Sequence, residues 1–252
     1  MLDFNQQKIS RMDYRDSHTG SDCAADYEAH YTRGRGYFYW QYFEKPYLKK
    51  LFARLGKEFP GRYLDFACGT GRILQLGAPY FAESFGIDVS ETMLAVARRS
   101  APTTRLIRAD VTTGPPDVGP FTVISLFRFL LNAEDCLRED VLRWLRVVIA
   151  PQSVLVVNNH LNRSSISGVS RRVRNLASSR HRYPVLSDGE VENLMRACGF
   201  SIFERYGFGF LPPNRYHNIL PLALLASLER RLQRITALQP YTQDRIYLCH
   251  PV

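Results

Sequence analysis

The segment at residues 64–72 (LDFACGTGR) carries the residue types best suited to hold a small ligand. Asp65 lies in an apolar run, and Gly69 and Gly71 follow it, where glycines let backbone amides approach a ligand closely. A dinucleotide site needs a third glycine, but Arg-Ile-Leu follows Gly71. A carboxylate here would also repel a pyrophosphate. Asp65 therefore favours a ligand with a cationic amino group.

Two further acids end later apolar runs. Asp88 comes 17 residues after Gly71, where a carboxylate can accept hydrogen bonds from ribose hydroxyls. Asp110 ends the next run and is placed to meet an adenine amino group. Taken alone, each acid has an alternative structural role as a helix N-cap or a solvated turn residue. Three acids at successive strand ends favour one ligand site at the carboxyl edge of a sheet.

The elements that must position these acids alternate between strands and helices. The strands are apolar throughout, as expected when both faces of a parallel sheet are covered. We expect strands at 62–66, 84–88, 105–109, 121–126 and 154–158, with helices at 72–80, from Ser90 onward, and at 134–150 before Pro151. A capping box at 187–190 opens a further helix that Gly199 ends, and 201–206 and 245–249 form a final strand pair.

Composition excludes several classes of protein. With 252 residues, 45% hydrophobic and 23% charged, the chain suits one folded α/β domain and not a disordered one. Five isolated cysteines without a CxxC pair disfavour a disulfide framework and a zinc ribbon. We therefore expect a cytoplasmic protein without a metal. The N-terminus has no hydrophobic signal core, and no apolar run reaches about 18 residues, as a membrane span requires.

Together these segments resemble the class I S-adenosylmethionine-dependent methyltransferases. Five pieces follow in that family's order and spacing, namely 64–72, GIDVSETML (86–94), RADV (108–111), FTVISLFRFLLN (121–132) and LSDGEVENLMRACGF (186–200). The resemblance implies an α/β Rossmann-like fold, with a seven-stranded, mostly parallel sheet, helices on both faces and one antiparallel strand near the edge. It also implies an N-terminal helical, aromatic lid at 1–60 and a methyltransferase domain at 61–252 that carries a C-terminal cap insertion.

The resemblance assigns S-adenosylmethionine as cofactor and S-adenosylhomocysteine as product. It places Asp65, Ala67, Gly69 and Gly71 at the methionine part, Asp88 at the ribose, Asp110 and Val111 at the adenine, Val89 and Met93 beside the adenine, and Leu126 where the fourth strand meets the cofactor. Ala67 departs from the family, which commonly has a glycine at this position.

The acceptor is less well defined. The Pro-Pro-aromatic signature of base-methylating enzymes is missing after the fourth strand, where Arg128 stands instead. Arg128 either holds a substrate anion or forms a surface salt bridge, and His160 is either a general base or a structural loop histidine. His217 is a weaker catalytic candidate. Acceptor contacts are expected from Tyr31, Tyr37, Trp40, Arg163 and Tyr216, although aromatic residues at helical spacing are more often packing residues.

Two additions to the core are expected on the acceptor side. Residues 160–184 hold six arginines and no acid, and so supply +6 of the net charge of +9. They form either a solvated helix or a site for an anion, such as a phosphate, a lipid headgroup or RNA. Residues 207–243 join a short apolar run to arginines, which fits either a cap helix or a helix at a membrane surface.

These features predict methylation from S-adenosylmethionine, with O-methylation of a small-molecule, glycan or lipid-linked, anionic acceptor as the leading hypothesis. An RNA methyltransferase, with the arginine segment as its groove, is the first alternative. A non-catalytic binding protein that keeps the fold is the second. We expect a cytoplasmic protein, with peripheral membrane association left open, and the sequence leaves the oligomeric state undetermined.

Overall fold

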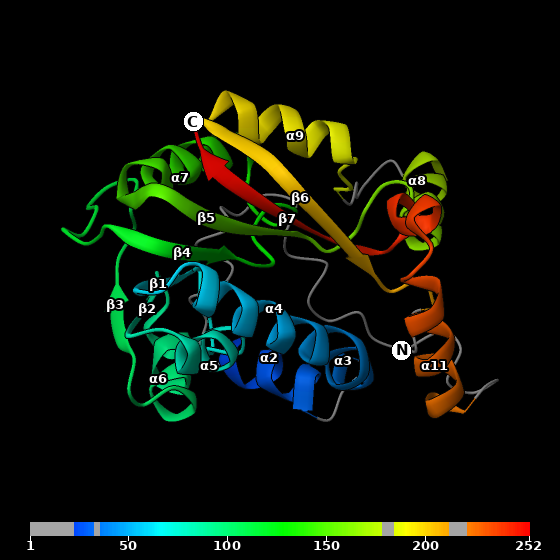
Figure 1. Cartoon of the computed structure of the whole chain (residues 1–252), viewed down its shortest axis with the longest axis horizontal. Helices are drawn as coiled ribbons and strands as arrows, with labels where there is room; N and C mark the ends of the chain where they lie inside the picture. Colours follow the sequence, from blue (N-terminus) through cyan, green and yellow to red (C-terminus); the bar gives the residue numbers. More distant parts are fainter. Residues whose placement is uncertain (1–22, 33–35, 178–183, 212–220) are drawn as a thin grey trace.

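A seven-stranded sheet organises the molecule (Figure 1). The computed structural model describes residues 23–32, 36–177, 184–211 and 221–252. The strand order is β3-β2-β1-β4-β5-β7-β6, with β1 to β5 parallel and β7 antiparallel to both of its neighbours. The strands are β1 (Arg62–Phe66), β2 (Glu83–Asp88), β3 (Arg105–Arg108), β4 (Phe121–Leu126), β5 (Ile149–Asn159), β6 (Phe200–Phe208) and β7 (Asp244–Pro251). The expected fold class and the final strand pair are confirmed.

Helices cover both faces of this sheet (Figure 1). One face carries α3 (Gly36–Tyr39), the π-helix η1 (Trp40–Glu44), α4 (Lys45–Glu58), α5 (Leu74–Gly77) and α6 (Glu91–Ser100), with α2 (Cys23–Thr32) beside them. The other face carries α7 (Asp135–Val148) and α9 (Asp188–Ala197). The 3-10 helix η2 (Ala78–Tyr80) follows α5, while α8 (Ile166–Ala177), α11 (Leu222–Leu232) and the 3-10 helix η3 (Thr236–Tyr241) lie together at one end of the molecule.

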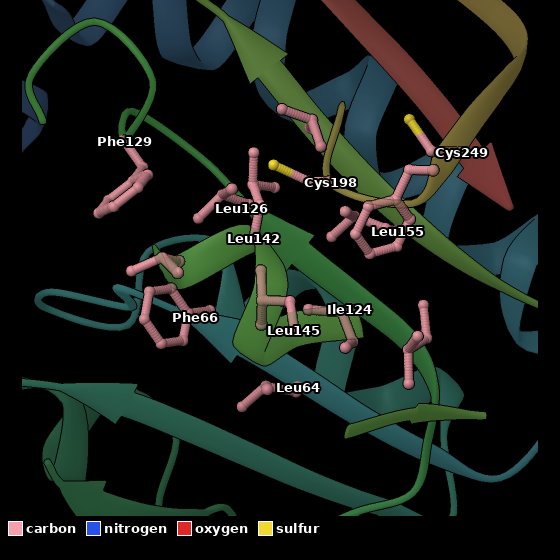
Figure 2. Close-up of a cluster of buried hydrophobic side chains, with 14 of the residues drawn as sticks. Leu64, Phe66, Ile124, Leu126, Phe129, Leu142, Leu145, Leu155, Cys198 and Cys249 are labelled. Carbon is pink, nitrogen blue, oxygen red and sulfur yellow. The ribbon is translucent and has the colours of Figure 1, made fainter. Parts of the chain in front are cut away.

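Alternation along the strands divides the buried residues into two cores. Leu64, Ile124 and Leu155 point to the α7 and α9 side, where Leu142 and Leu145 of α7 meet them (Figure 2). The intervening residues point to the opposite side, among them Tyr63, Val123, Val154, Ile246 and Leu248, and pack under α4 to α6. Because both sets are buried, the strands are apolar throughout in the sequence.

The ends of several elements differ from their predicted positions. The helix expected at 134–150 ends at Val148, and β5 begins at once, so that Pro151 lies within a strand instead of stopping a helix. The irregular register between β4 and β5, together with Gln152 at φ +57°, accommodates this proline. The expected helix at 72–80 is only the short α5 followed by η2, because Pro79 tightens its last turn. The predicted capping box of α9 and the left-handed Gly199 are confirmed.

The two cores define a stability test on a single helix. Leu142 of α7 is completely buried, whereas Val147 of the same helix is 80% exposed. Leu142→Ala should lower the free energy of unfolding by about 2–5 kcal/mol, since it removes transfer energy and leaves a cavity. Val147→Ala is the matched control and should change it by about 0.5 kcal/mol or less. Urea unfolding measures both, and equal losses would contradict this assignment of the core.

Candidate active site

A pocket lies at the carboxyl edge of the parallel strands. Eight of the ten predicted cofactor residues line it, namely Asp65, Ala67, Gly69, Asp88, Val89, Met93, Asp110 and Val111. The same wall includes Tyr27, Arg72, Phe127, Arg128, Phe129 and Asn132. The other two predicted residues lie beside the pocket. Leu126 is part of the buried core, and Gly71 packs against α6.

The turn after β1 needs left-handed backbone at three places. Gly69 has a φ of +53° and Gly71 a φ of +78°. A Cβ on Gly71 would lie 2.9 Å from Ser100 Oγ, whereas a Cβ on Gly69 would meet nothing within 4 Å. Ala67 also has a φ of +53°. This conformation strains alanine and explains why a glycine is usual at this position in the family that the sequence resembles.

Backbone amides orient the two outer carboxylates. Asp88 accepts hydrogen bonds from Gly69 N at 2.8 Å and from Ser90 N at 2.9 Å, so the end of β2 is tied to the glycine turn. Asp110 Oδ1 accepts from both the backbone N and the hydroxyl of Thr112. Both carboxylates therefore have defined positions in the pocket wall before any ligand binds.

Asp65 is the buried acid of the pocket. Its Oδ1 accepts a 2.5 Å hydrogen bond from Ser125 Oγ, and Ser125 Oγ lies 2.7 Å from the Tyr63 hydroxyl. Its Oδ2 is buried and has no hydrogen-bond partner in the described part of the chain. Burial raises the pKa of Asp65 to about 7, although the Ser125 hydrogen bond acts in the opposite direction. A cationic donor facing Oδ2 would satisfy this atom and favour the ionised form.

A second charged group lies where the N-terminal helices cover the pocket. Glu44, at the end of η1, is fully buried. Its carboxylate accepts hydrogen bonds from Arg72 Nη1 at 3.1 Å and from Arg128 Nη2 at 3.1 and 3.3 Å. Burial alone would raise the pKa of Glu44, but the two arginines outweigh burial and lower it. Glu44 is therefore ionised and joins the glycine turn to the end of β4.

Two aromatic rings pack against the guanidinium group of Arg72. Its guanidinium lies 4.1 Å from the ring centroid of Tyr31 and 4.2 Å from that of Trp40. Two of the predicted acceptor-contact aromatics therefore contact an arginine of the pocket wall. Tyr37 stacks edge-on against Phe38 and does not line the described pocket.

Arg128 contacts a further buried acid. Its Nη2 lies 3.9 Å from Asp244 Oδ1, at the start of β7. Asp244 also accepts hydrogen bonds from the Tyr39 hydroxyl and from Asn158 Nδ2. Burial raises the pKa of Asp244 to about 6, while Arg128 acts to lower it. Arg128 therefore belongs to a buried ionic network, not to a surface salt bridge, and its φ of +57° marks local backbone strain at the pocket.

His160 lies just beyond β5. Its Nδ1 is buried and has no hydrogen-bond partner among the residues that the structure describes. Burial, Arg128 and Arg72 together hold the pKa of His160 well below its usual value. The imidazole is therefore neutral near pH 7, but the lowered pKa also makes it a weaker proton acceptor, and His160 is not among the residues that line the pocket.

The remaining predicted residues are placed differently. Arg163 forms a 2.6 Å ion pair with Glu190 and donates a hydrogen bond to Val185 O, so it anchors the start of α8 to α9. His217 and Tyr216 lie outside the described residues, as do 178–183 of the arginine-rich segment. Gly207 and Phe208, at the start of the expected addition at 207–243, are the last residues of β6.

Sequence reasoning missed the residues that support the site. Glu44 is the one acid within the aromatic run at 37–43 and its flank, and an acid in such a run is a usable signal for a buried ion pair. Arg72 follows the glycine turn directly, which is a second signal. Ser125 and Asp244 gave none, because their partners lie 60 and 86 residues away in sequence.

The chain is similar to known methyltransferases in part of its sequence and in its fold. A family profile described as a methyltransferase domain matches residues 64–152, which include the glycine turn, β2 to β4 and α7. Among curated proteins, trans-aconitate 2-methyltransferase of Acidovorax sp. strain JS42 is 35% identical over 78 residues, and that of Acidovorax ebreus strain TPSY is 37% identical over 78 residues. Each alignment spans 30% of this chain and 30% of the relative's length.

Solved structures match over most of the chain at low identity. A possible histamine N-methyltransferase from Thermotoga maritima has a TM-score of 0.59 at 16% identity, covering 92% of this chain and 98% of its own. Magnesium protoporphyrin IX methyltransferase from Synechocystis, with bound S-adenosylhomocysteine, has a TM-score of 0.58 at 14% identity, covering 83% and 84%. An O-methyltransferase of neocarzinostatin biosynthesis, in complex with S-adenosylmethionine and a naphthoic acid, reaches 0.60 at 12% identity, covering 95% and 61%.

The sheet has the arrangement of the class I methyltransferase fold, because the antiparallel β7 lies between β5 and the edge strand β6. The glycine turn after β1 and the acids at three strand ends lie at its carboxyl edge. The fold of this chain is that of the class I S-adenosylmethionine-dependent methyltransferases, and its residues 64–152 match a methyltransferase domain. Within the described ranges, no cluster of three metal-ligating side chains was found, and no helix is long and apolar enough to cross a membrane.

The network around Glu44 generates a stability prediction. Glu44→Ala should lower the free energy of unfolding by about 3–5 kcal/mol, because it leaves the buried Arg72 and the partly buried Arg128 without their shared carboxylate. Glu139→Ala, which breaks the exposed pair with Arg143, is the control and should have little effect. Denaturant unfolding measures both variants. A Glu44→Ala protein as stable as the control would show that the network contributes no net stability.

Proposed function

We propose that this protein transfers a methyl group from S-adenosylmethionine to an oxygen atom of a small, negatively charged acceptor. The observation that carries the cofactor assignment is the buried, unpartnered Oδ2 of Asp65, flanked in the same pocket by Asp88 and Asp110. A primary ammonium group supplies the donor that Asp65 lacks. The oriented carboxylate of Asp88 suits a pair of ribose hydroxyls, and Met93 and Val111 offer apolar surface to an adenine.

The two arginines support an anionic partner. The Nε atoms of Arg72 and Arg128 are buried and lack a hydrogen-bond partner among the described residues, although both side chains line the pocket. An unsatisfied buried donor costs about 1–3 kcal/mol, so a ligand anion that accepts from it gains that amount. Arg72 adjoins the glycine turn and suits the carboxylate of the cofactor's methionine part. Arg128, at the end of β4, suits an anionic group of the acceptor, such as a carboxylate or a phosphate.

Methyl transfer depends mainly on aligning the acceptor atom with the methyl group of the cofactor. S-adenosylmethionine, when bound, supplies an electrophilic methyl group for in-line displacement. The residues of this chain hold the two reactants in line and exclude water. If the acceptor is a hydroxyl group, the proposed proton acceptor is His160, which burial and the nearby arginines keep neutral; an acceptor anion paired with Arg128 would offset the positive charge that lowers the pKa of His160. An acceptor carboxylate would need no base. The curated relatives named trans-aconitate 2-methyltransferase agree with an acceptor that carries carboxylates.

The pKa of Asp65 gives a pH dependence for cofactor binding. Only the ionised carboxylate pairs with an ammonium group, and the pKa in the free protein is about 7. The Kd for S-adenosylmethionine should therefore rise roughly tenfold per pH unit as the pH falls below 7, since one proton must leave before binding. Calorimetry between pH 5.5 and 7 measures this, in a range where the cofactor's own amino group stays protonated, its pKa being roughly 7.7–8.

Ser125→Ala is the companion variant for this measurement. Removing the hydroxyl that donates to Asp65 Oδ1 should raise the pKa of Asp65 further, and so move the loss of binding to higher pH. Asp65→Asn should bind more weakly at every pH and lose the dependence. A wild-type Kd that stays constant over this range would remove Asp65 from the cofactor site.

A label-transfer assay tests the reaction itself. Methyl-labelled S-adenosylmethionine is incubated with the protein and a cell extract, which is then split into organic, small aqueous and RNA fractions. Label should appear in the organic or small aqueous fraction.

Two variants test the acceptor side of the proposal. Arg128→Gln should raise KM for that acceptor and so lower kcat/KM by roughly tenfold to a hundredfold. His160→Ala should lower kcat by roughly a hundredfold or more for a hydroxyl acceptor. The cofactor Kd should stay unchanged in His160→Ala, because His160 does not line the cofactor pocket. Label confined to RNA would contradict the small-molecule acceptor, and full activity of His160→Ala would exclude a general-base role.

A further inference from the structure

Helix α8 exposes an apolar stripe on the surface of the protein. Ile166 is 57% exposed, Val169 48%, Val173 60% and Leu176 89%. Their spacing of three, four and three residues puts all four on one face of the helix. The face that packs inward is small and polar: Gly168 is buried, and Ser167 Oγ donates to Gln243 Oε1 at 2.8 Å. The helix is therefore held by its polar side and presents its apolar side outward.

Positive charge borders this stripe. At 3.6 residues per turn, Arg172 and Arg174 fall on opposite sides of it, and both are exposed. Neither has an ion-pair partner among the residues that the structure describes. No aspartate or glutamate occurs from residue 160 to residue 187. The stripe is thus an aliphatic surface with cations along its borders and no acid in its own segment.

The aliphatic side chains and flanking arginines of this surface indicate which kind of partner it can bind. Nucleic-acid bases are held by aromatic stacking, and Ile, Val and Leu offer none. A second copy of α8 packed on the first would bring arginines against arginines. Acyl chains bordered by anionic headgroups match both the aliphatic stripe and its flanking arginines. We propose that α8 is an interfacial helix, which docks the protein peripherally on an anionic lipid surface.

The position of α8 fits this role. It begins shortly after the carboxyl end of β5, the edge of the sheet that holds the pocket. At the same end of the molecule lie α11 and η3 (Figure 1). These helices and the short link between them add the exposed apolar side chains Ile235 and Tyr241 and the exposed Arg231 and Arg234. Docking through α8 brings the acceptor side of the enzyme to the lipid. This inference goes beyond the proposed function, which a water-soluble acceptor would satisfy equally well.

Vesicle co-sedimentation of the full chain tests the proposal. The protein should sediment with vesicles of equal parts phosphatidylglycerol and phosphatidylcholine, and not with phosphatidylcholine alone. Rising salt should weaken the binding, because it screens the arginines. Val173→Glu should weaken it about tenfold or more by removing buried apolar area. Val147→Glu is the matched control, since Val147 is 80% exposed but lies on α7, and it should bind as the wild type does. Arg172→Gln with Arg174→Gln should reduce affinity by roughly fivefold per arginine.

Each other outcome overturns the proposal. Absence of binding to anionic vesicles at low salt does so directly, as does an equal loss of binding in Val173→Glu and Val147→Glu. A concentration-dependent dimer that Val173→Glu dissociates would assign the stripe to a second copy, and salt-sensitive RNA binding lost in the arginine variant would assign it to RNA. Unchanged thermal unfolding and cofactor Kd in every variant show that the fold and the cofactor site are intact, so failure here leaves the proposed function standing.

Discussion

The fully buried carboxylate of Glu44 and the two arginines that pair with it are the constraint on which the pocket depends. A buried charge is tolerated only when it is paired and hydrogen-bonded, and here one carboxylate, Glu44, pairs with both Arg72 and Arg128. Glu44 lies on η1, Arg72 follows the glycine turn of β1, and Arg128 ends β4. The network therefore fixes the N-terminal helices against the carboxyl edge of the sheet. Without these helices, the arginines would face water and the pocket would lose one wall.

Burial also shifts the pKa values of two ionisable groups at this edge of the sheet. Desolvation raises the pKa of Asp65 to about 7 and holds that of His160 below its usual value. Asp65 can therefore exchange a proton near neutral pH, and His160 stays neutral there. Ser125 and Tyr63 form a chain of hydroxyl groups behind Asp65, which limits the effect of burial on it. Burial, cations and hydrogen bonds thus keep His160 neutral and leave Asp65 only partly ionised near pH 7.

The two ends of the molecule serve different purposes under these proposals. The cofactor half is built from the β1 turn, β2 and β3, whose residues the family profile covers. Apart from Arg128, the acceptor half is built from elements outside that profile: α2 to α4, α8, and the segments between β6 and β7. The amphipathic helix α8 belongs to this second half. Acceptor choice and attachment to a surface therefore depend on the same set of additions, while the shared core supplies the cofactor site.

The sequence by itself determined the sheet and the cofactor side. Continuous apolar runs, the glycine turn and Asp65, Asp88 and Asp110 are local signals, since each pattern lies within a few residues. They predicted β1 and β4 to the residue. The family resemblance that these signals carry implied one antiparallel strand near the sheet edge, which is β7, and the eight lining residues of the pocket. The prediction was wrong at the end of α7, where tertiary pairing with β4 carried Pro151 into a strand.

Only the tertiary structure decided the acceptor side. Glu44 meets Arg128 across 84 residues, and Asn158 meets Asp244 across 86, distances over which no periodicity in the sequence carries information. Whether Arg128 is a surface residue or a buried one, and whether the stripe on α8 faces the core or solvent, depends on which elements pack together. Burial is a property of the assembled fold, so the charges and proton affinities that depend on burial follow from the tertiary structure alone.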